Sequence, residues 1–220
     1  ENWTDVPGVL AADPRLVPQA EPIARLTYAQ LQSLSAVGMQ VLHESAVEPL
    51  RAAGIPLHIR STHHPEAPGT LIGCPDTGGG TDGAVGFAAR RGIAMLRLTP
   101  LAPHTAEDVR QTVQQAGVKI LHSAEGFEQM TLLLEADAAA LHLAAEQLAR
   151  RLPRTQIKLR ENLSLLAALQ GGKGALPRVI AAIQDAGVPV HDLAQTDACL
   201  LMIVNDSQFE TALRAAYEAR

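Results

Sequence analysis

The sequence has few aromatic residues, only two cysteines and no excess of positive charge. Aromatic residues make up 3% of the 220 residues, and 18 lysines and arginines face 23 acidic residues, which gives a formal net charge of −5. Proteins that bind nucleic acid normally present a basic surface and aromatic side chains on which bases stack. The composition therefore argues against nucleic acid as a partner.

The scarcity of cysteine and of long apolar runs excludes further classes. Cys74 and Cys199 have no partner at ligand spacing, so they indicate neither a disulfide framework nor a zinc site, and a reducing cytoplasm fits best. No apolar run approaches the roughly 20 residues of a membrane span. Among eight histidines, the adjacent His63 and His64 are the best metal candidates, but no carboxylate or thiol lies at a spacing that fixes a coordination geometry. We expect no metal site and no membrane partner.

The remaining composition, 47% hydrophobic and 19% charged, is that of a globular chain with room for two modest domains. The first 72 residues are rich in turns and then helical. Thr27 and Gln30 form a T-x-x-Q capping box that predicts a helix start ahead of apolar residues at helical spacing. A second short helix is expected over residues 46–53 and a strand over 55–59. Five glycines between Gly73 and Gly83 indicate a linker over residues 73–84.

Beyond this linker the sequence repeats itself with a shift of 70 residues. Gln115–Val118 recurs as Asp185–Val188, and Ile93–Thr99 aligns with Leu163–Leu169. Each copy predicts strand, helix, strand, strand, helix. In the first copy these are residues 93–99, 105–116, 118–122, 129–134 and 138–152. The second copy ends with a helix over 207–220, for which Ser207 and Glu210 form another capping box.

A strand count predicts how the two copies are connected. A βαββα unit leaves one position of its sheet open, and residues 155–160 can fill it for the first copy. The same shift places 155–160 on 85–90, just before the first copy. Residues 85–90 should therefore pair with the second copy's sheet, built from 163–169, 188–193 and 199–204. The first copy is then an insertion in the second.

Four spaced motifs carry a resemblance to a known family. They are Trp3–Val9 with Ala12–Arg15, Gly38–His43, Gly54–Thr62 and Pro65–Ile72. In this order they resemble the C-terminal part of aspartokinases. The resemblance implies an α/β (α+β) fold: the end of an amino-acid-kinase domain followed by two ferredoxin-like βαββαβ ACT domains, the first inserted in the second. The implied domains are 1–72 for the kinase segment, 73–84 for the linker, 85–91 plus 161–220 for the second ACT domain and 92–160 for the first.

The resemblance also implies an activity: transfer of the ATP γ-phosphate to the β-carboxylate of L-aspartate, with Mg²⁺, on the way to lysine, threonine and methionine. The Lys-Phe-Gly-Gly segment with which the family grips phosphate and aspartate is absent from this sequence. We therefore expect this chain alone to be inactive and to contain no catalytic residue of its own.

The nucleotide-binding residues implied by the resemblance are Thr4, Asp5, Arg15, Gln40 and Val41. An arginine fork suits a phosphate because it offers permanently charged, bidentate donors. The alternative is a turn-rich loop in which Asp13 caps backbone amides. Departures from the family pattern put nucleotide affinity in question: Leu10 replaces a tyrosine, Gln40 a lysine, and Glu44-Ser45 a Pro-Arg pair.

Two strand-to-helix turns are candidates for binding a regulatory amino acid. Gly172, Lys173 and Gly174 open a helix whose amides could hold a carboxylate, although a flexible turn explains them equally well. The equivalent turn of the first copy holds His104, Thr105 and Ala106. The resemblance implies that this turn binds a feedback effector, usually lysine or threonine. Pro103 stiffens the turn, and Glu107 and Asp108 place negative charge where a carboxylate would dock.

Two functions remain open at this point. The first is the regulatory portion of an aspartate kinase that pairs with other copies through its ACT domains into a homo-oligomer. The second is a non-catalytic subunit that binds an amino acid or serves assembly and keeps a degenerate nucleotide site, which Leu10 and Gln40 favour.

Overall fold

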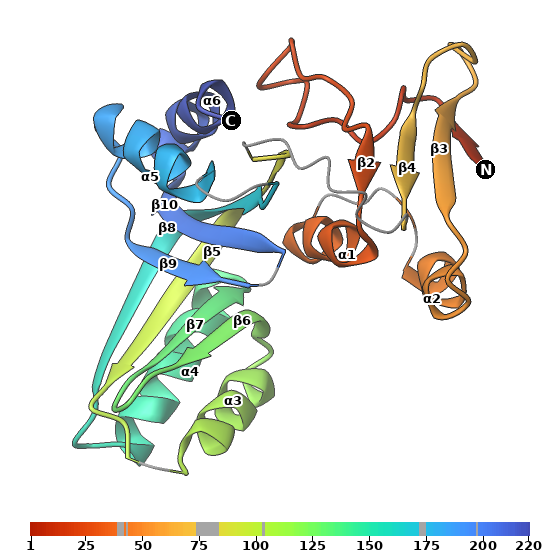
Figure 1. Ribbon diagram of the computed structural model, residues 1–220. Coiled ribbons are helices and arrows are strands. Elements are labelled where there is room, and N and C mark those ends of the chain that lie inside the picture. Colours follow the sequence, from red (N-terminus) through yellow and green to blue (C-terminus); the bar gives the residue numbers. More distant parts are fainter. Residues whose placement is uncertain (39–41, 43, 74–83, 103, 172–174, 197) are drawn as a thin grey trace. The chain divides into compact units, whose positions relative to one another are not determined.

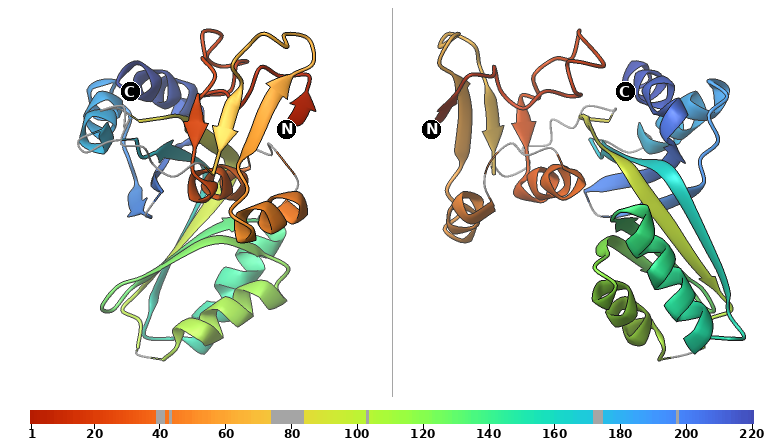
Figure 2. Two further views of the ribbon diagram at one scale, coloured as in Figure 1. Left: turned by 45° about the vertical axis from the view of Figure 1, so that its right-hand side comes forward. Right: turned by 180° about the vertical axis from the view of Figure 1, so that it is seen from behind.

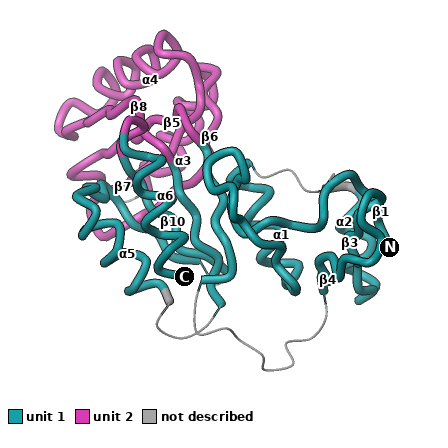
Figure 3. The backbone as a smooth tube through the Cα atoms, turned by 90° about the horizontal axis from the view of Figure 1, so that it is seen from above, with its two compact units in different colours: residues 1–90, 165–204, 208–220 teal, residues 91–164, 205–207 magenta. Residues whose placement is uncertain are grey.

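The computed structural model describes the whole chain except residues 39–41, 43, 74–83, 103, 172–174 and 197 (Figure 1). The chain divides into two compact units (Figure 3). The first unit comprises residues 1–90, 165–204 and 208–220, and the second comprises 91–164 and 205–207. No helix of the described residues combines the length and the apolar character that crossing a membrane requires.

The first unit begins with a four-stranded sheet in the order β1-β3-β4-β2. Its strands are β1 (Asn2–Thr4), β2 (Arg25–Leu26), β3 (Leu57–Ser61) and β4 (Thr70–Ile72). β1 runs parallel to β3 and β2 parallel to β4, whereas β3 and β4 are antiparallel. The buried hydroxyl of Thr70 accepts a hydrogen bond from Val9 N at 2.9 Å and donates one to Ile23 O at 2.7 Å. A buried polar group is thus satisfied where the turn-rich loop crosses the sheet.

Two helices accompany this sheet, α1 (Tyr28–Val37) and α2 (Glu44–Ala52). The predicted capping box is confirmed. Thr27 Oγ1 accepts from Gln30 N at 3.1 Å, and Gln30 Oε1 accepts from Thr27 N at 2.8 Å. α1 ends at Gly38, whose φ of 107° lies in the left-handed region that favours glycine. The strand expected over 55–59 begins two residues later, at Leu57, because Pro56 cannot donate to a ladder.

A second, six-stranded sheet follows in the order β6-β7-β5-β8-β10-β9. Its strands are β5 (Phe87–Thr99), β6 (Lys119–Glu125), β7 (Met130–Glu135), β8 (Gln156–Leu169), β9 (Asp192–Gln195) and β10 (Cys199–Asn205). The helices between them are α3 (Ala106–Gln115), α4 (Ala138–Arg151), α5 (Ala175–Asp185) and α6 (Phe209–Glu218). When each element is exchanged with its counterpart in the other repeat, the strand order reads the same from either edge. The sequence repeat is therefore a structural repeat.

The strands shared by the two repeats are longer than expected. Residues 87–99 form one strand and 156–169 another, where the sequence analysis placed two separate strands in each range. Within these strands, Gly92 and Asn162 have positive φ angles of 68° and 56°. The two residues stand at equivalent positions of the repeat. Glycine and asparagine tolerate this conformation, so the strand can bend there without ending. Val85 N donates to Leu169 O at 3.0 Å and Leu169 N to Gly86 O at 2.8 Å, so this segment lies beside the end of β8.

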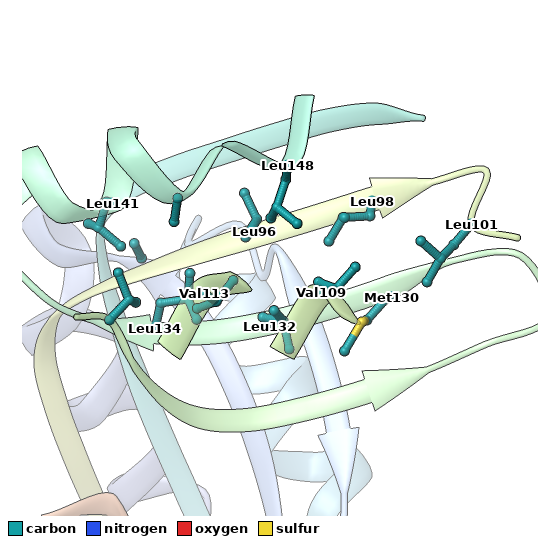
Figure 4. Packing of buried hydrophobic residues seen from close by; sticks show 13 residues of the cluster. Leu96, Leu98, Leu101, Val109, Val113, Met130, Leu132, Leu134, Leu141 and Leu148 are labelled. Atoms are coloured by element: carbon teal, nitrogen blue, oxygen red, sulfur yellow. The ribbon is translucent and has the colours of Figure 1, made fainter. Parts of the chain in front are cut away.

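The core of the second unit lies between its sheet and two helices. α3 and α4 cover one face of β5, β6 and β7 (Figures 1 and 2). Leu96 and Leu132 lie in the centre of this core and are 1% and 0% exposed (Figure 4). The other large side chains around them come from both helices, the adjoining strands and the loop between β5 and α3: Leu98, Leu101, Val109, Val113, Met130, Leu134, Leu141 and Leu148.

The first unit joins the beginning and the end of the chain. Phe87 N donates to Ala11 O at 2.7 Å, and the Phe87 side chain is 1% exposed. Tyr217 lies beside Phe87, with ring centroids 6.4 Å apart, and donates its hydroxyl hydrogen to Gln19 O at 3.1 Å. Arg220 forms an ion pair with Glu21 at 2.6 Å. The final helix is thus held by residues about two hundred positions earlier in the sequence.

Two expectations for the second repeat were wrong in detail. The capping box at Ser207 and Glu210 does not form: residues Asp206–Gln208 make a 3-10 turn, and α6 begins at Phe209 without a side-chain cap. The neighbouring Asp206 carboxylate accepts hydrogen bonds from Arg91 and Ser164. Ser207 lies inside the 3-10 turn, whereas it was expected at the N-cap of the helix. The strand expected over 188–193 lies at Asp192–Gln195 instead.

Candidate functional site

Thr4 and Asp5 stand where β1 ends and the turn-rich loop begins. Thr4 Oγ1 accepts a hydrogen bond from Val6 N at 3.2 Å, and Thr4 O accepts one from Thr62 N at 2.8 Å. The backbone of Thr4 is therefore fixed by the start of the β3–β4 connection. Asp5 is exposed. The loop thus presents a carboxylate directly after an anchored strand.

Arg15 is exposed but already engaged by a carboxylate of its own turn. Its Nη2 and Nε donate to Asp13 at 2.6 Å and 3.0 Å, and its side chain is 86% exposed. Asp13 Oδ1 also accepts from Arg15 N at 2.9 Å, which is the amide capping foreseen as the alternative interpretation. The Arg15 guanidinium lowers the pKa of Asp13, and the same hydrogen bonds raise the pKa of Arg15. A phosphate at Arg15 would therefore compete with Asp13.

The other positions of the implied nucleotide site are Leu10, Gln40 and Val41. Leu10 is half-buried and forms an antiparallel β-bridge with Pro22. Gln40 and Val41 lie outside the described residues, and α2 begins at Glu44. The described hydrogen bonds of Arg15 all go to Asp13, and those of Thr4 go to Val6 and Thr62. The structure therefore does not join these residues through direct contacts.

The turn before α3 brings His104, Thr105 and Ala106 to the start of that helix. His104 has a φ of 69°, which a non-glycine residue rarely adopts. Thr105 holds the N-cap position, but its hydroxyl donates back to Ala102 O at 2.6 Å and makes no cap hydrogen bond. The first amides of α3 therefore have no side-chain acceptor from the N-cap, and such amides suit an anionic ligand group.

The strand β6, which lies beside α3, contributes residues that the sequence did not indicate as site candidates. Arg110 Nε donates to Glu107 at 2.9 Å, and the same guanidinium pairs with Glu125 at the end of β6. These pairs hold the first turns of α3 beside the last residues of β6. Ser123, two residues before Glu125, has a buried Oγ without a hydrogen-bond partner among the described residues. In the sequence, Ser123 stands out only as a small polar residue directly after the strand expected over 118–122.

The equivalent turn of the second repeat falls on Gly172, Lys173 and Gly174, which lie outside the described residues, and α5 begins at Ala175. Gln170, just before them, accepts a hydrogen bond at its carbonyl oxygen from Gln30 Nε2 at 2.9 Å. For metals, His64 lies 3.5 Å from Glu66, and the described part of the chain contains no group of three or more potential ligand side chains.

The first part of the chain is similar to amino acid kinases. Residues 1–61 match the model of the amino acid kinase family. The chain is 25% identical to aspartokinase 3 of Bacillus subtilis over 232 residues, covering 99% of this chain and 51% of that protein. It is 27% identical to the Clostridium acetobutylicum aspartate kinase, with a TM-score of 0.87 over 99% of this chain and 53% of that one.

Two more distant structures share the fold. Aspartokinase III of Escherichia coli, in complex with lysine and aspartate, has a TM-score of 0.73 at 21% identity and covers 98% of this chain and 50% of that one. The regulatory subunit of aspartate kinase from Thermus flavus has a TM-score of 0.55 at 20% identity and covers 62% of this chain and 98% of that one. Together with the Bacillus and Clostridium proteins, these comparisons show that the chain is similar to the C-terminal part of aspartokinases, from the end of the kinase domain onwards. It spans about half the length of the Bacillus relative.

Proposed function

We propose that this chain is the regulatory portion of an aspartate kinase, the enzyme that moves the γ-phosphoryl group of ATP onto the β-carboxylate of L-aspartate. The observation that carries the proposal is the match of fold and sequence over 99% of the chain to the Clostridium acetobutylicum aspartate kinase. In this role the chain senses an amino acid and contributes to assembly.

The regulatory region is two ACT modules, one inserted in the other. The first is residues 92–160, and the second is 85–91 together with 161–220. The hydrogen bonds of Leu169 with Val85 and Gly86 support this division, because they join the segment before the insertion to the strand after it. The compact unit of residues 91–164 supports it as well, since the sequence of the other unit continues on both sides.

The effector of the first module is a free amino acid, lysine or threonine, held at His104, Thr105 and Ala106. The uncapped amides of α3 suit its carboxylate, and the unpartnered Oγ of Ser123 offers a hydrogen bond at the adjoining strand. The Escherichia coli relative was crystallised with lysine. Gly172, Lys173 and Gly174 form the corresponding turn of the second module.

Calorimetric titration of the chain with lysine and threonine tests the effector site. We expect one of them to bind, and Ser123→Ala to weaken that binding about tenfold through loss of one hydrogen bond to a charged ligand. Ser123→Ala removes only the hydroxyl, which has no hydrogen-bond partner among the described residues, so thermal stability should hold. Unchanged affinity in Ser123→Ala would refute this site, and heat from neither amino acid would refute the effector.

ATP and Mg²⁺ belong to the intact enzyme, and this chain would supply part of their site. Arg15 offers a charged donor to phosphate, with Nη1 not used by Asp13, while Thr4 and Asp5 lie on the anchored loop. Gln40 and Val41 complete the implied set. The ion pair of Arg15 with Asp13 also gives a specific reason for the alternative function, a non-catalytic regulatory or assembly subunit with a degenerate nucleotide site.

A further inference from the structure

A cavity of about 220 Å³ lies between α1 and α2. One face of α1 and one face of α2 line it: Tyr28, Leu31, Gln32, Ser35, Ala36, Val47, Glu48 and Arg51. All these residues belong to the first compact unit and lie outside the nucleotide loop and the α3 turn. Pockets for drug-sized ligands measure roughly 300–1,000 Å³, so this cavity suits a smaller metabolite.

The cavity has an apolar floor and a charged rim. Leu31 is 1% exposed and Val47 is half-buried. Tyr28 is held in place because its hydroxyl donates to Ile55 O at 2.6 Å. At the rim, Gln32, Glu48 and Arg51 are exposed. A ligand with a short apolar part and a polar, charged end would match both regions.

The charges of the rim are of opposite sign and only loosely paired. Arg51 Nη1 lies 3.3 Å from Gln32 Oε1 and 3.8 Å from Glu48 Oε2. Both contacts use the same nitrogen, so the other guanidinium donors remain for a ligand carboxylate. Glu48 can accept an ammonium group. A cation and an anion side by side match the two charges of an α-amino acid.

We propose that the α1–α2 cavity binds a free α-amino acid with an aliphatic side chain, its carboxylate on Arg51, its ammonium group on Glu48 and its side chain on Leu31 and Val47. The proposal does not depend on the effector site at the α3 turn. It places a second amino-acid site in the kinase segment of the chain.

The test is an NMR titration of the ¹⁵N-labelled chain with L-leucine. We expect saturable shifts of the backbone amides in residues 28–36 and 46–51. Arg51→Gln and Glu48→Gln should each weaken binding about tenfold, the order expected for one charged hydrogen bond. The matched controls are Arg150→Gln and Glu146→Gln, an exposed pair 3.5 Å apart on α4, which should bind leucine as the unmodified chain does.

Two leucine analogues, a cavity-filling variant and the location of the NMR shifts test the ligand's charges and its binding site separately. 4-Methylpentanoate and 3-methylbutylamine each lack one charge of leucine and should bind more weakly, and equal binding of either would overturn recognition of a zwitterion. Ala36→Phe narrows the cavity and should abolish the shifts, so undiminished binding would overturn the location. Shifts confined to residues 104–125 would overturn this site while leaving the proposed effector site standing, and an absence of saturable shifts would overturn the proposal outright.

Discussion

Asp206 gathers three groups of the second unit around one carboxylate. Arg91 donates to it from Nε at 3.1 Å and from Nη2 at 2.9 Å, and Ser164 Oγ donates at 2.5 Å. The Arg91 guanidinium, with smaller contributions from Ser164 and the Gly92 amide, lowers the pKa of Asp206 from 3.8 to about 2. The folded pKa lies below the unfolded one, so the stabilisation is present above pH 4 and disappears as the pH falls towards 2.

Replacing Asp206 by asparagine should therefore destabilise the chain at pH 7 by about 1–2 kcal/mol, a value reduced for the partial exposure of the pair. The difference from the unmodified chain should shrink between pH 4 and pH 2. Urea denaturation at several pH values measures both effects. Glu146→Gln removes an exposed carboxylate and should cost little at any pH. A penalty for Asp206→Asn that stays constant from pH 7 to pH 2 would contradict the assigned cause.

Gly69 and Gly54 provide a matched pair for backbone strain. Both have a positive φ, 69° and 64°, but a Cβ at Gly69 would collide with the carbonyl oxygen of Ile59, whereas one at Gly54 would meet nothing. Gly54→Ala should cost about 1 kcal/mol for the left-handed conformation alone. Gly69→Ala should cost clearly more, because the β3 backbone must also move. Thermal denaturation of the two variants compares them, and equal losses would show that β3 yields easily.

At the scale of elements, short-range signals in the sequence were the most reliable. The T-x-x-Q box at Thr27 predicted the start of α1, since both partners lie within one helical turn. The similar signal at Ser207 failed because Ser207 lies inside a 3-10 turn and Gln208 takes the N-cap position of α6. Next to it, Asp206 bonds to Arg91 and Ser164, which lie far away in the sequence. The repeat predicted the order of helices and strands in both copies, but it placed the strand now seen at Asp192–Gln195 over 188–193. It also did not predict that the chain would continue through Gly92 and Asn162 as two long strands.

The candidate site was less accessible to sequence reasoning than the fold. The resemblance selected Arg15, but only the structure shows that Asp13 occupies its fork. Ser123 acquires its importance from a missing hydrogen-bond partner, and no local pattern reveals that. The cavity between α1 and α2 also depends on how two helices pack. Side-chain geometry and packing decide these features, even where the partners are close in the sequence.

Deleting residues 1–90 tests whether the segment before the first repeat completes the sheet of the second repeat. The deletion removes Phe87 from its contact with Tyr217 and leaves Leu169 without the hydrogen bonds of Val85 and Gly86. Loss of one buried aromatic side chain alone costs about 3–5 kcal/mol. Hydrogen exchange should show lost protection in residues 165–204 and retained protection in 93–160. Equal protection of both regions, or greater loss around Ile93–Thr99, would show that the repeats do not depend on each other in this way.

At the scale of the whole molecule, we expect no kinase activity from this chain alone. The Lys-Phe-Gly-Gly segment is absent from its sequence, and Arg15 is paired with Asp13. Incubation with ATP, Mg²⁺ and aspartate should release no ADP above the blank. Turnover at an ordinary kinase rate, about 1–100 per second, would show that the chain is catalytically sufficient.

The chain should also self-associate. β6 and β9 are the outer strands of the six-stranded sheet, and unpaired backbone groups on such strands invite pairing with another copy. Sedimentation velocity across a concentration series should show a dimer or a larger species at tens of micromolar, where interfaces of standard size are usually occupied. A constant monomer over that range would argue against homo-oligomerisation.

The hydrogen bonds of Leu169 with Val85 and Gly86 affect how the protein emerges from the ribosome. Val85 leaves the exit tunnel long before its partner has been made, and at about 5–20 residues per second the wait is on the order of ten seconds. During that time residues 91–164 can complete their own core, whose contacts all lie within the nascent segment. The strand that precedes them must stay unpaired until Leu169 arrives. Translation speed between residues 85 and 169 should therefore set how long this strand stays unpaired, and slower translation there should increase aggregation.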